Sequence, residues 1–475
     1  MAQRYLVVSD IHLSDIEDNP KGWKYYKSSR YLPDEALVSL IDDFLGSLAE
    51  GDEGTLVLNG DIFDFDLVTA WPRDASFKVT RGEKKRGLRP TPEKSAWKME
   101  RILDCHESVL ACLVRLSAAG HRIVYVLGNH DRELHFSLVR EVFLERLEAA
   151  ASAAGLSFDR SELQFEPWFF YVPGKLYAEH GQQYDYYNSF RYILEPVVVR
   201  RGETELAMPM GNISNRLLMS GMGYFNPHAT HYILNMFSYA VHWFRYYAFT
   251  RHNLVSSWFW GSILALSRLM GTKRRLRKPP TGYEDRLRRY GEKSALTPEQ
   301  FQAIQQLQRA PITDRAFRIV REFWIDRLVM AVLMTGGTVA LALVPIPLWI
   351  KLMVPLTCFP LIYFIYEAVV QGETVFSAES GVANYAKCLG KALKVPVVTF
   401  GHSHTPRILP VEPGAVFVDT GTWAPLTSAK EPWPLLSGYR NFLEVLFGEG
   451  SPLPSIRYDC HQGGSGAEKG KCEEG

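Results

Sequence analysis

The sequence predicts an α/β fold that carries a large, mostly helical hydrophobic insertion. Short β-branched runs alternate with helical patterns in the order β-α-β-α-β, and each run leads into a polar loop. Residues 191–372 differ in character, with crowded aromatic side chains, a basic run and a nearly continuous apolar stretch. The chain has 475 residues, 47% of them hydrophobic, which allows two or three domains with buried cores.

The elements of the first half follow from apolar periodicity and turn residues. Three buried strands are predicted at Arg4–Ser9, Thr55–Leu58 and Arg122–Leu127. Helices are predicted from Pro33 to a stop at Gly51, at Ser95–Ala119 and at about Phe136–Ala154. Functional side chains in α/β sheets gather at the carboxyl ends of strands, so the loops after these strands are the first places to search.

Four further strands are predicted on both sides of the insertion. They are Leu176–Glu179, Val395–Phe400, Ala415–Asp419 and Tyr439–Phe447. The tail at 459–475 is rich in glycine and mixed charge, which predicts disorder.

Composition limits the compartment and the partners. The formal net charge is +1, so there is no strong nucleic-acid signal in the charge balance. The six cysteines form no C-x-x-C pair, and the N-terminus has no long apolar segment followed by a cleavage site. These features favour a reduced, cytoplasmic environment.

Five motifs place metal-binding side chain types directly after predicted strands. They are Asp10-Ile-His12, Gly60-Asp61-Ile-Phe-Asp64, Gly128-Asn129-His130-Asp131, Ala178-Glu-His180-Gly, and Gly401-His402-Ser-His404. Each motif alone is also typical of an ordinary loop or a satisfied core histidine. All five in this order are not explained by chance, and mixed carboxylate and imidazole ligands suit manganese, iron or zinc.

This pattern resembles the calcineurin-like metallophosphoesterase family over about Arg4–His180 and Val395–Phe447. The resemblance implies a four-layer α/β/β/α sandwich and a binuclear metal centre. It also implies that one metal is bound by Asp10, His12, Asp61 and His404, and the other by Asp61, Asn129, His180 and His402. Asp61 would bridge two divalent ions, whose identity the ligands leave open among Mn, Fe and Zn.

The implied activity is hydrolysis of phosphate esters or anhydrides. Two cations lower the pKa of a shared water and so provide a hydroxide that attacks phosphorus. His130 is not an implied ligand, which makes it the candidate general acid or transition-state stabiliser, and Asp64 would orient its ring. The Thr420–Trp423 turn is expected to support the site or simply to pack. A polar substrate rim at Tyr184, Asp185 and Asn188 is the alternative to a packing loop.

The insertion contains a candidate transmembrane hairpin at 328–369. Residues 328–350 carry no charge and can cross an apolar layer of about 30 Å. Pro345, Pro347 and Lys351 mark the expected tip, and prolines 355 and 360 predict an irregular second limb. Because motifs before and after the insertion must meet in one site, the chain must cross a membrane an even number of times. The alternative is a soluble helical cap that dimerises or covers the site.

Membrane association gives the preferred interpretation of the whole chain. A catalytic domain split into 1–190 and 373–450 would lie on the cytoplasmic side, because arginines precede the hairpin. The histidines at 228, 231 and 242 are expected to pack or to lie at the interface rather than to bind metal. The substrate would be a phosphorylated small molecule or lipid; the oligomeric state stays open.

The layout also resembles the UDP-2,3-diacylglucosamine pyrophosphatases, which hydrolyse a lipid-bearing nucleotide sugar. Those enzymes typically carry arginine where this chain has His130, so their specific activity does not transfer directly. Two alternatives are a soluble phosphodiesterase for nucleotides that uses the insertion as a lid, and a non-catalytic membrane docking module with a vestigial metal site.

Overall fold

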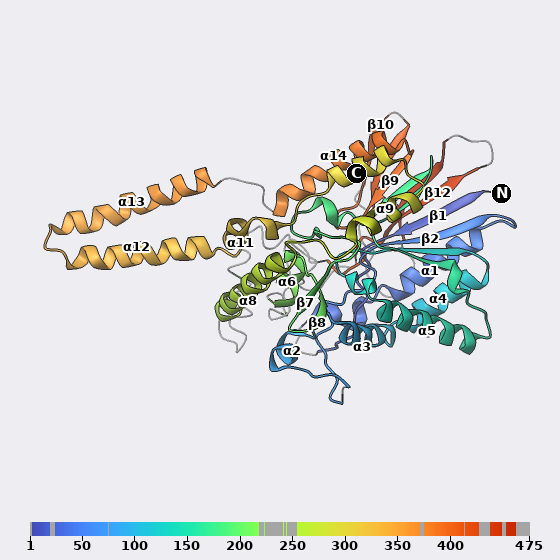
Figure 1. The fold of residues 1–475 in the computed structure, drawn as a ribbon, viewed down its shortest axis with the longest axis horizontal. Helices are drawn as coiled ribbons and strands as arrows, with labels where there is room; N and C mark the ends of the chain where they lie inside the picture. Colours follow the sequence, from blue (N-terminus) through green and yellow to red (C-terminus); the bar gives the residue numbers. More distant parts are fainter. Residues whose placement is uncertain are drawn as a thin grey trace.

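The computed structural model shows a layered body from which one helical hairpin projects (Figure 1). It describes residues 2–19, 24–74, 76–217, 223, 241, 244, 254–370, 375–412, 414–426, 438–448 and 453–461. The histidines at 228, 231 and 242, most of the aromatic segment before residue 254, and the tail from 462 onward lie outside these residues.

Two β-sheets form the centre of the body. The first has the strand order β13-β12-β1-β2-β3-β4, with bounds Ser455–Cys460, Asn441–Phe447, Gln3–Val8, Glu53–Asn59, Arg122–Val126 and Leu163–Glu166. The second has the order β10-β11-β9-β6-β5, with bounds Arg407–Glu412, Ala415–Asp419, Val397–Phe400, Leu176–Glu179 and Phe169–Val172. Strands β1, β2 and β3 are parallel, as are β6, β9 and β11, so their carboxyl ends share an edge.

Helices cover the outer face of each sheet. On the first sheet lie α1, α3, α4 and α5, which span Asp34–Ser47, Pro92–Leu103, Glu107–Ala118 and Ser137–Ala154. On the second lie α9, α10 and α14, which span Tyr283–Lys293, Pro298–Leu307 and Val375–Leu393.

The alternation along β1 explains these layers. Leu6 and Val8 pack against the helices, whereas Tyr5 and Val7 pack between the two sheets. The predicted four-layer α/β/β/α arrangement is confirmed.

Most predicted strands occur within two residues of their expected bounds, but the helix predicted at Ser95–Ala119 is wrong. The chain instead forms α3 and α4, separated at Asp104–His106. His106 is buried there, with Nδ1 2.8 Å from Asp34 Oδ1 and Nε2 2.8 Å from the Ser14 carbonyl oxygen. These long-range partners interrupt a segment that is helical by local pattern alone.

The segment 191–372 contributes to the body as well as to the hairpin. Phe301 and Ile304 of α10 are buried against the second sheet. The two-stranded sheet β7–β8 spans Val197–Arg200 and Glu203–Leu206, and beside it lie α6 at Met210–Leu217 and α8 at Leu254–Arg275. The short helix α2 at Arg81–Arg86 completes this side of the molecule.

The hairpin consists of α12 at Ile325–Leu343 and α13 at Leu348–Val369, and it follows α11 at Ala316–Glu322. Length and composition alone identify both as candidate membrane spans, and no part of their apolar windows is buried in the body. Helix α13 continues through Pro355 and Pro360. The expectation of an irregular second limb is therefore wrong for this structure, because packing and local adjustment can accommodate proline in an apolar helix.

The C-terminal end also differs from expectation. Asp459 and Cys460 end strand β13, where pairing with β12 orders them, although the sequence places them in a disordered tail. Cys105, Cys112, Cys358 and Cys388 are free thiols, whereas Cys460 is disulfide-bonded, which the cysteine spacing did not predict.

Candidate metal centre

The carboxyl ends of five strands deliver the motifs to one place. Asp10 follows β1, Asp61 follows β2, and Asn129 follows β3 in the first sheet. His180 directly follows β6 in the second sheet, and His402 follows β9 after one glycine. The loops after β1 and β2 are joined by backbone hydrogen bonds, from Asp10 N to Gly60 O at 3.0 Å and from His12 N to Asp61 O at 2.9 Å.

The backbone at these positions is strained. Asp10, His12, Asp61, His402 and His404 all have positive φ, between 52° and 69°. This left-handed region is costly for side chains other than glycine, and such residues cluster at functional sites.

Glycines in the motifs allow the close approach of ligand side chains. A Cβ at Gly128 would clash with the carboxylate and backbone nitrogen of Asp61, and one at Gly401 would clash with the Asp10 carboxylate. Glycine is therefore required at both positions because a side chain would not fit, and not because the backbone needs flexibility.

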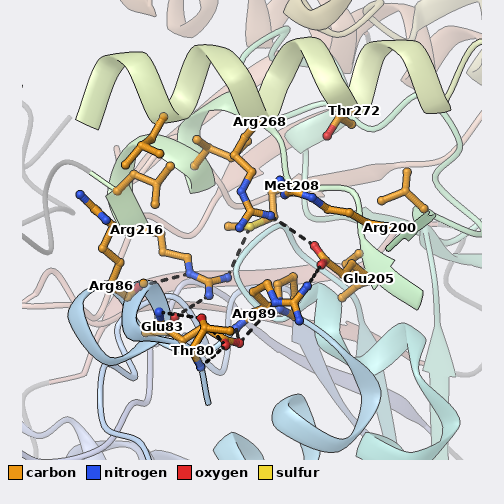
Figure 2. A pocket seen from close by; sticks show the side chains of 18 of the residues that line it. Thr80, Glu83, Arg86, Arg89, Arg200, Glu205, Met208, Arg216, Arg268 and Thr272 are labelled. Carbon is orange, nitrogen blue, oxygen red and sulfur yellow. Dashed lines mark hydrogen bonds and ion pairs between the residues drawn. The ribbon is translucent and has the colours of Figure 1, made fainter. Parts of the chain in front are cut away.

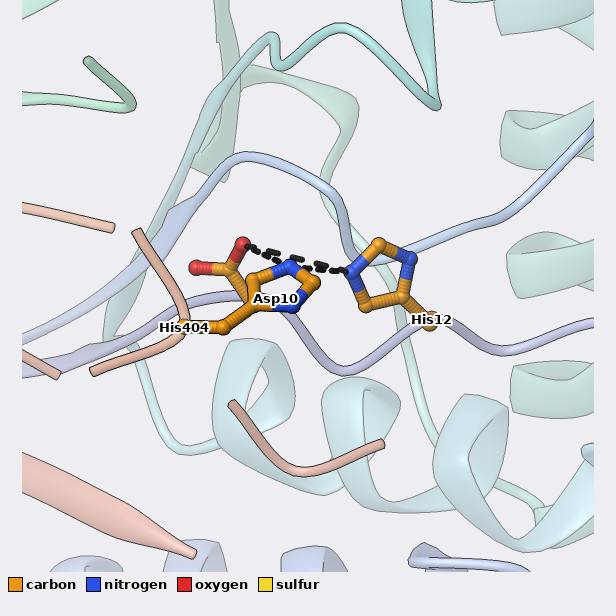
Figure 3. A group of neighbouring side chains, drawn as sticks. All are labelled: Asp10, His12 and His404. Atoms are coloured by element: carbon orange, nitrogen blue, oxygen red, sulfur yellow. Dashed lines mark hydrogen bonds and ion pairs between the residues drawn. The ribbon is translucent and has the colours of Figure 1, made fainter. Parts of the chain in front are cut away.

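Asp10, His12 and His404 form the first candidate ligand cluster (Figure 3). His404 Nε2 lies 3.2 Å from Asp10 Oδ1, and His12 Nε2 lies 3.9 Å from the same oxygen. The two Nε2 atoms are 3.2 Å apart. Two ring nitrogens so close can share at most one proton, and their lone pairs converge as cation binding requires.

Asp61, His180 and His402 form the second cluster. His180 Nε2 lies 3.0 Å from Asp61 Oδ2, and its Nδ1 is 3.0 Å from the Asn59 carbonyl oxygen. A hydrogen bond from Nδ1 to that carbonyl fixes the ring and leaves Nε2 toward the centre, which is the usual outer contact of a metal-binding histidine. His402 Nε2 is also 3.1 Å from Asp185 Oδ2.

Asn129 offers an oxygen ligand beside these clusters. Its Oδ1 is buried and accepts no hydrogen bond within the part of the chain that the structure describes. Its Nδ2 donates to Asn212 Oδ1 at 3.3 Å, so the side-chain oxygen Oδ1 of Asn129 points away from Asn212. A buried amide oxygen without a donor is costly, and a cation would satisfy it. The residues present therefore fit a divalent metal.

Asp64 joins His12 and His130 in a third cluster. Its Oδ2 lies 3.1 Å from His12 Nδ1 and 3.0 Å from His130 Nδ1. Its Oδ1 accepts hydrogen bonds from the backbone nitrogens of Asp66 and Leu67, at 2.9 and 3.0 Å. Asp64 is thus held rigidly, and it favours a proton on Nδ1 of both rings.

The electrostatics of the site reflect many buried charges in contact. Burial raises the pKa of the Asp61 carboxyl, but His180 and His130 outweigh this and hold it well below its usual range. Burial lowers the pKa of His130, yet the Asp64 and Asp61 carboxylates dominate and raise it to about 10. The cluster of carboxylates demands positive charge, which imidazolium groups or bound cations can supply.

The turn Thr420–Trp423 supports Asp10 directly. Trp423 N and Thr422 Oγ1 each donate to the Asp10 carbonyl oxygen at 3.0 Å. In the predicted substrate rim, Asp185 and Asn188 pair at 2.7 Å near His402. Tyr184 is instead buried, with its hydroxyl on Glu179 Oε2 at 2.7 Å, so it belongs to the core.

Three residues that position Asn129 were not predicted from the sequence. Asn212 Nδ2 donates to the Asn129 carbonyl oxygen at 3.0 Å and to Asp66 Oδ2 at 2.8 Å. Arg132 Nη1 donates to the same Asn129 oxygen at 2.6 Å and forms a bidentate pair with Asp66. Arg132 and Asp66 lie next to motifs, but Asn212 lies in the insertion with no local signal.

Comparison with known proteins agrees with this geometry. The sequence model of the calcineurin-like phosphoesterase family matches residues 3–261, more than half of the chain. A search of curated proteins finds no match. The family match ends before His402 and His404, which the fold nevertheless brings to Asp10 and Asp61. The chain belongs to the calcineurin-like phosphoesterases and is a metallophosphoesterase hydrolase.

Proposed function

We propose that this chain hydrolyses a phosphate ester or anhydride on an amphiphilic substrate at the cytoplasmic surface of a membrane. One observation carries the hydrolytic part of the proposal: two clusters, Asp10–His12–His404 and Asp61–His180–His402, form where the carboxyl ends of strands from both sheets meet. Asp61 would bridge two divalent ions, and Asn129 would add its unsatisfied oxygen to the second.

The metal ions would supply charge for the phosphate and a nucleophilic hydroxide at neutral pH. The chain's own groups then position the substrate and deliver a proton. Because Asp64 Oδ2 lies 3.0 Å from His130 Nδ1 and favours a proton there, the proton available to a leaving oxygen would be the one on Nε2. Burial lowers the pKa of His130, but the Asp64 and Asp61 carboxylates raise it to about 10, which favours the charged ring. A charged ring could donate a proton or stabilise negative charge.

The membrane part of the proposal rests on the hairpin. Its side chains are strongly exposed, as at Leu333 with 70% and Leu356 with 70%, which no soluble surface of this size tolerates well. Figure 1 shows it projecting away from the body, which does not suit a lid over the metal centre. At about 1.5 Å per residue, helices of 19 and 22 residues match a hydrocarbon core of about 30 Å.

Polar residues at the base of the hairpin mark the proposed membrane border. Arg327 Nε lies 2.8 Å from Glu367 Oε1, Tyr366 donates to Asp326, and Arg321 donates to the Val370 carbonyl oxygen. At the opposite end Lys351 Nζ donates to the Ala342 carbonyl oxygen at 2.7 Å. Arginines at the base favour the cytoplasmic side for the body.

A lipid-linked phosphate is the substrate that this arrangement favours. The resemblance to UDP-2,3-diacylglucosamine pyrophosphatases supports a lipid-bearing pyrophosphate, whereas His130 in place of their arginine argues for a different leaving group. Manganese is the first metal to test, since carboxylate, amide and imidazole ligands all suit it.

The test compares one soluble and one lipid substrate. Detergent-purified protein with Mn²⁺ is assayed on bis-p-nitrophenyl phosphate and on a lipid-linked pyrophosphate in vesicles. A Leu333→Arg, Leu356→Arg variant of the hairpin should no longer bind vesicles and should hydrolyse the lipid-linked substrate at least tenfold more slowly. Its turnover of bis-p-nitrophenyl phosphate should equal that of wild type.

Matched controls are Leu138→Arg and Leu156→Arg, which alter exposed leucines of the body. They should leave both activities unchanged. Equal vesicle binding and equal lipid turnover in the hairpin variant and wild type would reject the membrane part and favour a soluble phosphodiesterase. No metal-dependent turnover of either substrate would reject hydrolysis and favour a docking module.

A further inference from the structure

A cavity lies on the side of the body formed by α2, the β7–β8 sheet, α6 and α8 (Figure 2). Its volume is about 170 Å³, far above the roughly 10–15 Å³ that one water needs. None of the proposed metal ligands lines it. The cavity is therefore separate from the metal centre.

One part of the cavity wall is apolar. Side chains from the β7–β8 sheet, the loop after β8, α6 and α8 form it: Val198, Leu206, Met208, Ile213, Leu217 and Leu264. Such a wall favours a ligand that carries hydrocarbon as well as charge.

Another part of the wall is rich in arginine. Arg86, Arg89, Arg200, Arg216, Arg268 and Arg275 line the cavity with only two glutamates, Glu83 and Glu205. Both glutamates are already neutralised. Glu205 pairs with Arg89 and, at 3.4 Å, with Arg268, and Glu83 pairs with Lys94 at 2.6 Å. Net positive charge remains in the cavity.

Three of these arginines provide that charge. The side chains of Arg86, Arg200 and Arg275 make no hydrogen bond or ion pair with any described residue. Burial lowers the pKa of Arg200; the nearby Glu205 carboxylate opposes this, but the like charges of Arg275 and Arg201 add to it, and the pKa stays below its usual value. An anion in the cavity would relieve this repulsion, and guanidinium groups match phosphate oxygens in pairs.

Helix α8 extends the apolar wall outward. Leu264, Arg268 and Thr272 recur every four residues on its cavity side. Trp260, one turn before Leu264, is 57% exposed. Ile263, which directly precedes Leu264, is 42% exposed. An apolar tail leaving the cavity would therefore find further apolar surface along the same helix.

We propose that this cavity binds the phosphate headgroup of an anionic lipid, with the lipid's apolar part against α8, as a site separate from the metal centre. The proposal does not depend on what the metal centre hydrolyses, because it concerns binding by other residues.

The experiment measures binding of dioleoyl phosphatidic acid to the full detergent-purified chain by calorimetry. The Arg200→Gln, Arg275→Gln variant should bind about tenfold more weakly, the equivalent of one lost charge-assisted contact. The control is Arg274→Gln, Arg277→Gln, which removes the same charge at nearby exposed positions outside the cavity and should bind as wild type does.

Two further measurements keep the test decisive if the arginine variant is unstable. Leu264→Gln should weaken binding of phosphatidic acid several-fold, and dioleoylglycerol, which lacks the phosphate, should not compete. Asp61→Asn should leave binding of phosphatidic acid unchanged, because the metal centre is not the proposed site.

Each contrary result overturns the proposal. Equal losses in the two arginine double variants would mean non-specific attraction by charge. Inorganic phosphate competing as well as phosphatidic acid would mean a free-phosphate site. Loss of binding in Asp61→Asn alone would assign the lipid to the metal centre.

Discussion

The Asp64 carboxylate orients the imidazole rings of both His12 and His130. Asp64 is held by two backbone N–H groups and holds the rings of both His12 and His130 through Nδ1. His12 then directs Nε2 to the first ligand cluster, while His130 would offer the proton on its Nε2 to the substrate. In the proposed mechanism the same carboxylate would therefore support both metal binding and proton transfer.

Replacement of His130 by asparagine should therefore separate these roles. His130→Asn should lower kcat by about 10²–10⁴-fold, the usual contribution of a general acid, with bound metal unchanged. Metal content by elemental analysis and kcat on bis-p-nitrophenyl phosphate check this. His121→Asn, a half-buried histidine away from the site, is the control. Loss of metal together with kcat in His130→Asn would contradict the assignment.

Asn212 should govern metal affinity without touching the metal. It holds Asn129 through both the side chain and the carbonyl oxygen. Outer contacts of this kind typically contribute 10–100-fold to metal affinity. Asn212→Ala should weaken Mn²⁺ binding by about that factor in a calorimetric titration. Asn215→Ala, three residues later in α6, should leave the Mn²⁺ affinity unchanged. Identical affinities in the two variants would refute a role of Asn212 in metal binding.

The ligands could be predicted from sequence because each motif is local. A strand, a glycine and a carboxylate or histidine within a few residues suffice to identify Asp61 or His402. Asn212 could not be predicted, since its contact with Asn129 spans 83 residues and arises only from the fold.

At the scale of elements, the break between α3 and α4 connects the helical layer to the site. His106 lies at the break and bonds to Asp34 of α1 and to Ser14, just after His12. His106→Ala leaves both buried partners unsatisfied and should lower the free energy of unfolding by about 1–3 kcal/mol.

Chemical denaturation in detergent measures this loss. The control His121→Ala should change stability by less than about 0.5 kcal/mol, because that side chain makes no hydrogen bond with a described residue. Equal stability of the two variants would show that the break needs no histidine.

The same break shows why local patterns mislead. Residues 95–119 have helical periodicity throughout, and only the distant Asp34 and Ser14 reveal the interruption. Conversely, Pro355 and Pro360 predict a broken limb, yet α13 continues through them. Strands were predicted more reliably than helix ends, since short runs of β-branched residues are typical of buried parallel strands.

At the scale of the whole molecule, two exposed cysteines can report where the membrane lies. Cys358 lies in α13 and Cys388 in α14 of the body, and both are exposed free thiols. In inverted membrane vesicles a membrane-impermeant maleimide should label Cys388 and leave Cys358 unmodified, because lipid would cover α13.

Peptide mass spectrometry identifies the labelled positions. In detergent after denaturation both cysteines should react, which controls for intrinsic reactivity. Rapid labelling of Cys358 in intact vesicles would contradict insertion of the hairpin. Labelling of Cys388 only from outside intact cells would reverse the proposed orientation.

The layered body could be anticipated from the family resemblance, but the role of residues 191–372 could not. This segment supplies α9 and α10 to the second sheet, Asn212 to the metal centre, and a hairpin that stays outside the body. Composition identifies the hairpin, whereas the other two contributions depend on contacts with distant segments.

The central claim is that two clusters form one hydrolytic metal centre bridged by Asp61. The most direct test measures Mn²⁺ stoichiometry and bis-p-nitrophenyl phosphate turnover of detergent-purified protein, for wild type and Asp61→Asn. We expect about two metal ions per chain and metal-dependent turnover in wild type, with both reduced in Asp61→Asn. Full turnover and unchanged metal content in Asp61→Asn would contradict it.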